Sequence, residues 1–127
     1  MTKKTLAFIF LTIFLIGFVT FEQIYTNNAL STLKQEVNTL STEIENENLN
    51  ASKTQIKKVI SMWNQNEKII CLFVDFRDLE NIGKFAVQVY SHLDNEDFEL
   101  AKVECNSLQK AIDTFYNMIS IDITNIL

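Results

Sequence analysis

The residues best equipped for chemistry lie close together in the last third of the chain. His92 is the only histidine, and Asp94, Glu96, Asp97 and Glu99 follow it. A lone histidine with no cysteine or second histidine near it is a weak metal ligand or general base. The carboxylates lack the glycine that a calcium loop needs. They suit the capping of a helix start, and His92 suits the last turn of the helix before, so we predict no metal site here.

Two cysteines and one tryptophan are the other candidates. Cys71 and Cys105 both fall on apolar helix faces, where free cysteines are commonly buried. A disulfide between them stays open as an alternative, because a turn near residues 75–78 would bring them to similar heights in a bundle. Trp63 falls on an apolar face as well, where it either anchors the packing or stacks against a ligand.

Nothing else in the chain has the pattern of a catalytic or nucleotide-binding motif. There is no nucleophile elbow, and two distant glycines, Gly17 and Gly83, exclude a glycine-rich phosphate loop. The net charge of −5 gives no basic footprint for nucleic acid. We therefore predict that the protein is not an enzyme, has no cofactor and does not bind nucleic acid.

The N-terminal segment has the pattern of a membrane anchor. Lys3 and Lys4 precede an apolar run, and residues 5–21 are just long enough to cross a bilayer. A cleaved signal peptide is the alternative, but the residues after the run are poor for cleavage. The lysines favour an N-terminus inside and a C-terminal domain outside, in a single-pass protein of the cell membrane.

The composition predicts an all-α fold. The chain has no proline, and both glycines lie within apolar helical patterns. Five apolar residues between Leu30 and Ile44 recur every three or four positions and predict one buried stripe. That stripe is too short to argue a free-standing coiled coil, so we expect the edge of a bundle.

Three more helices are expected after the first. Ser52 and Gln55 form a capping box that predicts the start of the second helix. A single helix over residues 52–93 would run back into the bilayer, so a turn is predicted at 75–78. Gly83 in the third helix indicates a close helix approach or a bend. The fourth helix follows a connection at 94–97.

The resulting prediction is an N-terminal transmembrane helix followed by an antiparallel bundle of about four helices with up-down-up-down topology. Residues 1–25 form the basic start and anchor, and residues 26–127 form the extracytoplasmic bundle. Ile119, Ile121 and Ile123 alternate with polar residues, which predicts an extended apolar tail close to the membrane.

Trp63, the segment from Phe73 to Ile82 and the terminal Asn125-Ile126-Leu127 carry a resemblance to a known family. The layout resembles a family of small single-span proteins from Gram-positive spore formers, a domain of unknown function (DUF family 4363). The family often has a histidine where this chain has Phe76, which weakens any metal or proton-transfer role there. The resemblance implies a membrane-anchored helical protein working beside another membrane protein, and it implies no known reaction.

We expect an interaction or accessory module of the cell envelope. Its partners would be the lipid bilayer, through residues 5–21, and another membrane or envelope protein. The candidate contact residues are Trp63, Phe76, Ile126 and Leu127. Two alternatives remain: a sensor-like bundle that binds a small ligand between its helices, and a coiled-coil scaffold of the cell-division type.

Overall fold

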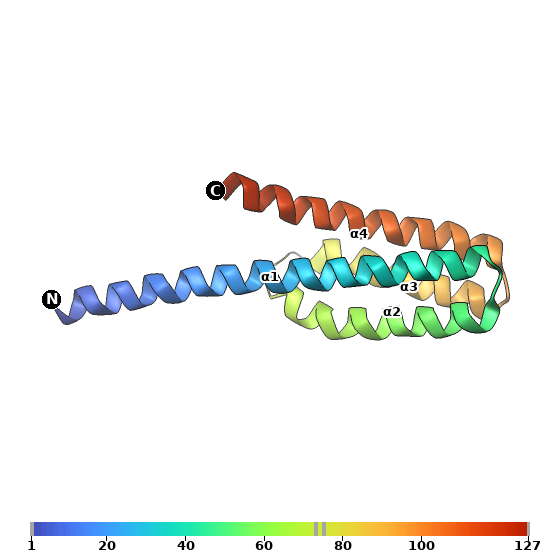
Figure 1. The fold of residues 1–127 in the computed structure, drawn as a ribbon, viewed down its shortest axis with the longest axis horizontal. Coiled ribbons are helices and arrows are strands. Elements are labelled where there is room, and N and C mark those ends of the chain that lie inside the picture. Colours follow the sequence, from blue (N-terminus) through green and yellow to red (C-terminus); the bar gives the residue numbers. More distant parts are fainter. Residues whose placement is uncertain (1, 73, 75, 127) are drawn as a thin grey trace.

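The protein is an all-α four-helix bundle with one greatly extended helix. The computed structural model describes residues 2–72, 74 and 76–126. Its helices are α1 (Lys3–Glu45), α2 (Leu49–Ile70), α3 (Phe76–Asp94) and α4 (Phe98–Ile126). Each helix packs against the next and α4 packs back on α1, which confirms the predicted antiparallel topology (Figure 1).

Helix α1 runs without a break from the apolar N-terminal segment into the bundle. Its N-terminal part projects beyond the other helices, and its residues up to Phe21 are exposed (Figure 1). This part is a candidate membrane span by length and composition, and a signal sequence would pass the same test. No Gly or Pro interrupts α1 between the projecting part and the bundle, so the two are joined by continuous helix.

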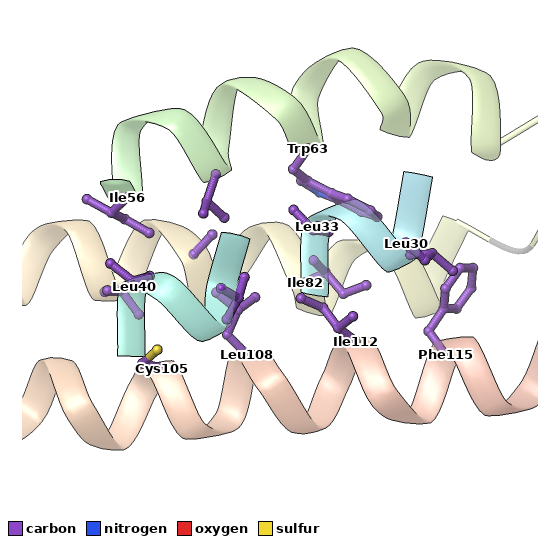
Figure 2. Close-up of a cluster of buried hydrophobic side chains, with 14 of the residues drawn as sticks. Leu30, Leu33, Leu40, Ile56, Trp63, Ile82, Cys105, Leu108, Ile112 and Phe115 are labelled. Carbon is purple, nitrogen blue, oxygen red and sulfur yellow. The ribbon is translucent and has the colours of Figure 1, made fainter. Parts of the chain in front are cut away.

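The core is formed by apolar side chains that recur every three or four residues on each helix. The predicted stripe of α1 is fully buried, and Trp63 and Phe115 are the largest fully buried side chains of the same core (Figure 2). The buried apolar residues are Leu30, Leu33, Val37, Leu40, Ile44, Ile56, Val59, Trp63, Ile70, Leu79, Ile82, Ala86, Val89, Leu93, Ala101, Cys105, Leu108, Ile112 and Phe115.

The predicted break between the second and third helices exists, a few residues earlier than expected. Helix α2 ends at Ile70 and α3 begins at Phe76, so residues 76–78 lie inside α3. Arg77 and Asp78, two of the charged residues that suggested the turn, occupy the first turn of the new helix. Polar residues are frequent there, which explains the displacement.

The predicted capping box is wrong. Asn48 caps α2 by accepting a hydrogen bond from the backbone N–H of Ala51 at 3.3 Å. Ser52 lies one turn inside the helix and is fully buried. Gln55 donates instead to the backbone carbonyl of Glu36 on α1, at 2.9 Å. A second cap residue just upstream allowed the helix to start earlier than the box indicated.

The predicted extended tail is also wrong, because α4 stays helical to Ile126. The alternation that suggested a strand is compatible with a helix, since positions 115, 119, 123 and 126 also follow a spacing of three or four. No glycine or proline stands in this segment to end the helix.

The two helical hairpins of the bundle are copies of one pattern. The α1–α2 connection reads Ile44-Glu45-Asn46-Glu47-Asn48-Leu49, and the α3–α4 connection, 49 positions later, reads Leu93-Asp94-Asn95-Glu96-Asp97-Phe98. Glu47 and Glu96 both adopt a left-handed backbone, with φ of 54° and 58°. In each connection the next residue closes a Schellman cap, with an N–H···O bond of 3.1 Å from Asn48 and 2.9 Å from Asp97.

The same offset relates the buried positions of the two hairpins. Leu30, Leu33, Val37, Leu40 and Ile44 correspond to Leu79, Ile82, Ala86, Val89 and Leu93. On the second helix of each hairpin, Ser52, Ile56, Val59 and Trp63 correspond to Ala101, Cys105, Leu108 and Ile112. The bundle therefore has an internal repeat, and a rotation about its long axis relates α1 to α3 and α2 to α4.

The repeat gives a matched stability prediction. The hydroxyl of Ser52 is buried without a hydrogen-bond partner in the described part of the chain, whereas the equivalent position holds Ala101. We expect Ser52→Ala to raise the free energy of unfolding by about 1 kcal/mol, because it removes an unsatisfied buried hydroxyl. The reverse change Ala101→Ser should lower it. Chemical denaturation of the full chain in micelles measures both, and a loss of stability in Ser52→Ala would contradict the prediction.

Candidate functional site

A continuous aromatic face runs along α1 from the candidate span to the base of the bundle. The rings of Phe14 and Phe18 stack with centroids 6.5 Å apart, and those of Phe21 and Tyr25 stack at 6.1 Å. The spacing of three and four residues places these rings on one side of the helix. The buried stripe of α1 begins at Thr26, about 100° around the helix from Tyr25. Phe14, Phe18 and Phe21 are exposed, and Tyr25 packs against the edge of the core.

This face leads into a groove of about 420 Å³ between α1 and α2. Tyr25 closes the groove on the inside, since its hydroxyl donates a 2.8 Å hydrogen bond to Oδ1 of Asn66 on α2. Small and apolar side chains form most of the walls. The lining residues are Phe21, Ile24, Tyr25, Asn28, Ala29, Thr32, Met62 and Asn66.

The internal repeat produces a second groove of about 330 Å³ between α3 and α4. Its lining includes Asn81, Ala111 and Phe115, which are the positional equivalents of Thr32, Met62 and Asn66 in the first groove. The two grooves lie on opposite sides of the bundle, and the first of them continues the aromatic face of the candidate span.

Trp63 is a packing residue of the core. Its side chain is 2% exposed and points from α2 into the space between the helices (Figure 2). A Cβ placed at Gly83 on α3 would lie 3.2 Å from the indole Nε1, so Gly83 permits the close helix approach that its position predicted. The indole N–H has no partner among the described residues, and Trp63 does not line either groove.

Comparison with known proteins identifies the family of the bundle. The model of a domain of unknown function, DUF4363, matches residues 20–126. The chain belongs to the DUF4363 family. The match includes Trp63, both hairpins and both grooves, and it starts at the end of the apolar run. No curated protein and no solved structure matches the chain.

The two cysteines of this DUF4363 chain are free, against the open alternative of a disulfide. Cys71 follows the end of α2, whereas Cys105 lies on α4, and these two helices are diagonal neighbours with no contact among the described residues. The expected similar heights are wrong as well. Cys105 is the equivalent of Ile56 in the repeat, and Cys71 lies 15 residues beyond Ile56, so the two cysteines are about 20 Å apart along the bundle. Burial raises the pKa of the Cys105 thiol to about 11, and a hydrogen bond with Ser41 acts in the opposite direction. Cys71 is exposed.

Three candidate contact residues stay predictions. The backbone of Phe76 begins α3 and that of Ile126 ends α4, but their side chains lie outside the described residues, as does all of Leu127. The height of the α4 end follows from its register with α1. Lys34 on α1 pairs with Asp113 on α4 at 2.8 Å. Counting 13 residues toward the span along these two antiparallel helices places residue 126 level with about residue 21.

The acidic connection after His92 has the predicted structural role. Asp97 caps α4 by accepting a 3.0 Å hydrogen bond from the N–H of Leu100. His92 lies in the last turn of α3, where its carbonyl takes part in the Schellman cap. Among the residues that the structure describes, no group of three or more His, Cys, Asp or Glu side chains could hold a metal ion.

Proposed function

We propose that the protein is a single-span, membrane-anchored interaction module whose partner is another membrane or envelope protein. The partner would contact the aromatic face of α1 and extend into the groove between α1 and α2. The observation that carries this proposal is the continuity of that face, from Phe14 in the candidate span to Tyr25 at the groove. A helix that crosses the bilayer beside α1 could follow this face out of the membrane without changing direction.

Exposure of the groove residues supports a protein partner. Ile24 is 57% exposed and Phe21 is 59% exposed, although both stand at or beyond the end of the predicted span. Lipid tails can cover the apolar residues inside the bilayer, but apolar side chains above it need another cover. Ala29 and Thr32 have small side chains, which allow a second helix to come close.

The anchor and its direction rest on the N-terminal sequence. Lys3 and Lys4 stand at one end of the apolar run, and the exposed carboxylates of Glu45 and Glu47 stand at the far end of α1. Positive residues are retained on the cytoplasmic side. The proposal therefore places the N-terminus inside and the bundle outside the cell membrane.

Site-specific photocross-linking in native membranes tests the proposal. A benzophenone amino acid at Ile24 should give one discrete adduct with a second protein. A probe at Asn117, exposed on α4 about 9 Å further from the span than Ile24, is the control and should give none. Within the span, Phe14 should cross-link to the same protein and Leu15, on another side of the helix, should not.

Two outcomes would contradict the proposal. Equal cross-linking at Ile24 and Asn117 would show that the groove has no defined partner. An adduct of twice the mass of the chain would identify a second copy, as the scaffold alternative requires. A sensor would instead need a ligand site within the bundle. Loss of cross-linking on addition of a small molecule would favour that alternative.

A further inference from the structure

The end of the bundle nearest the candidate span exposes apolar side chains beside the basic residues Lys68 and Arg77. Leu72, in the connection after α2, is 75% exposed, and Cys71 beside it is exposed as well. Ile69 in the last turn of α2 adds an exposed apolar side chain at the same end. We call this set, Ile69, Cys71 and Leu72, the base of the bundle.

The opposite end of the bundle has the reverse character. Its two connections expose Glu45, Glu47, Asp94 and Glu96. Figure 1 shows that α1 projects from the base and that these acidic connections lie at the far end. A water-exposed bundle has no reason to distinguish its two ends in this way, whereas a bundle standing on a membrane does.

The register of α1 and α2 places the base at the height where the predicted span ends. The hydrogen bond between Tyr25 and Asn66 fixes the two helices side by side. Five residues beyond Asn66 bring the chain to Cys71, about 7.5 Å lower, and four residues before Tyr25 bring it to Phe21, about 6 Å lower. Cys71 and Phe21 are therefore level to within about one helical turn.

The short length of the span brings the bilayer closer still. Residues 5–21 give about 25 Å of helix, whereas the hydrocarbon core of a bilayer is about 30 Å thick. A span shorter than the core draws its flanking residues toward the lipid. Because α1 is continuous helix, the base moves with it and cannot withdraw into water.

We infer that the base is a second lipid contact, in which Leu72 and its neighbours rest in the headgroup layer beside the span. This inference rests on the proposed anchoring by α1. The lipid is the occupant that the structure favours, because it surrounds the span at the height of the base, whereas a protein would have to reach the base from one side. The contact holds the bundle against the membrane surface with its acidic end outward.

Cys71 offers a native position for a depth probe. The pKa of Cys105 is about 11 and its side chain is buried, so a maleimide fluorophore at neutral pH labels Cys71. The full chain, labelled and reconstituted in phosphatidylcholine vesicles, is then exposed to brominated lipid or to aqueous iodide. The matched control carries the same fluorophore at the acidic end, in Glu47→Cys with Cys71→Ser.

Brominated lipid should quench the Cys71 probe at least about threefold more than the control probe, because a bromine atom quenches only a fluorophore that lies close to it in the bilayer. Aqueous iodide should quench the control probe more than the Cys71 probe. Leu72→Asp should move the Cys71 probe toward iodide quenching while the chain stays in the vesicles. Leu72 is exposed, so this variant is expected to fold.

Iodide quenching of both probes to the same extent, with no effect of brominated lipid, would overturn the inference. Extraction of the unlabelled chain by alkaline carbonate would show a different failure, that of the anchor itself. In native membranes, a Cys71 probe shielded from both quenchers would show that a protein covers the base. That result would also overturn the inference, because a protein and not lipid would then be the natural occupant of the base.

Discussion

Replacement of Trp63 by alanine is expected to lower the free energy of unfolding of the bundle by about 3–5 kcal/mol. Trp63 is the largest fully buried side chain, and it fills the space between α2 and α3 that Gly83 leaves open. The surrounding helices can close that space only in part, so a cavity remains. Far-UV circular dichroism of the full chain in micelles, followed through chemical denaturation, measures the change.

Trp63→Phe is the control for this prediction, because it retains an aromatic ring and should cost about half as much or less. Gly83→Leu should also destabilise the bundle, since its side chain would collide with the indole ring. A loss below about 1 kcal/mol in Trp63→Ala would contradict a packing role. It would favour the alternative in which Trp63 serves a ligand.

Gln23→Pro is expected to separate the motion of the bundle from that of the span. Gln23 lies within α1, between the apolar run and the groove, so proline there removes one backbone hydrogen bond and clashes with the carbonyl of residue 19. In an unbent helix the proline would cost about 3 kcal/mol or more of stability, so the helix should kink instead. Double electron–electron resonance between nitroxides at Phe14 and Glu47 should show a shorter and broader distance distribution.

Gln23→Ala provides the matched control, because alanine keeps the hydrogen bond and favours helix. It should retain the narrow distribution of the unchanged chain. Since the bundle starts beyond the kink, its unfolding transition should change little in either variant. A broad distribution already present in the unchanged chain would show that α1 is flexible at this point, and the base would then not be held at a fixed height.

Much of the bundle could be predicted from the sequence because its signals are strong and local. The stripe from Leu30 to Ile44 repeats at the helical period, and every member of it is buried. The break after α2 followed from length alone, because one straight helix could not fit above a bilayer. Gly83 predicted a close approach, and the indole ring of Trp63 occupies the space beside it.

The predictions that were wrong depended on how the helices are arranged around one another. Asn48 and Ser52 are both good caps, and the choice between them depends on which residue faces the core. The pairing of Cys71 with Cys105 depended on the heights of the two residues and on helix adjacency, and no local pattern contains either. Phe14, Phe18 and Phe21 fit an ordinary membrane segment by sequence alone. The hydrogen bond between Tyr25 and Asn66 requires two helices in register, which no local pattern contains. The hairpin repeat was present in the sequence but requires comparison at long range.

Because of the repeat, equivalent positions of the two hairpins can be compared within the same molecule. Trp63 on α2 lies against Gly83 on α3, whereas the equivalent positions hold Ile112 on α4 and Lys34 on α1. Lys34 is half exposed and pairs with Asp113, so the close approach of an indole to a glycine occurs at this position in one hairpin pairing and not in the other. Positions that differ between the halves, such as Asn66 and Phe115, can therefore be compared within one protein.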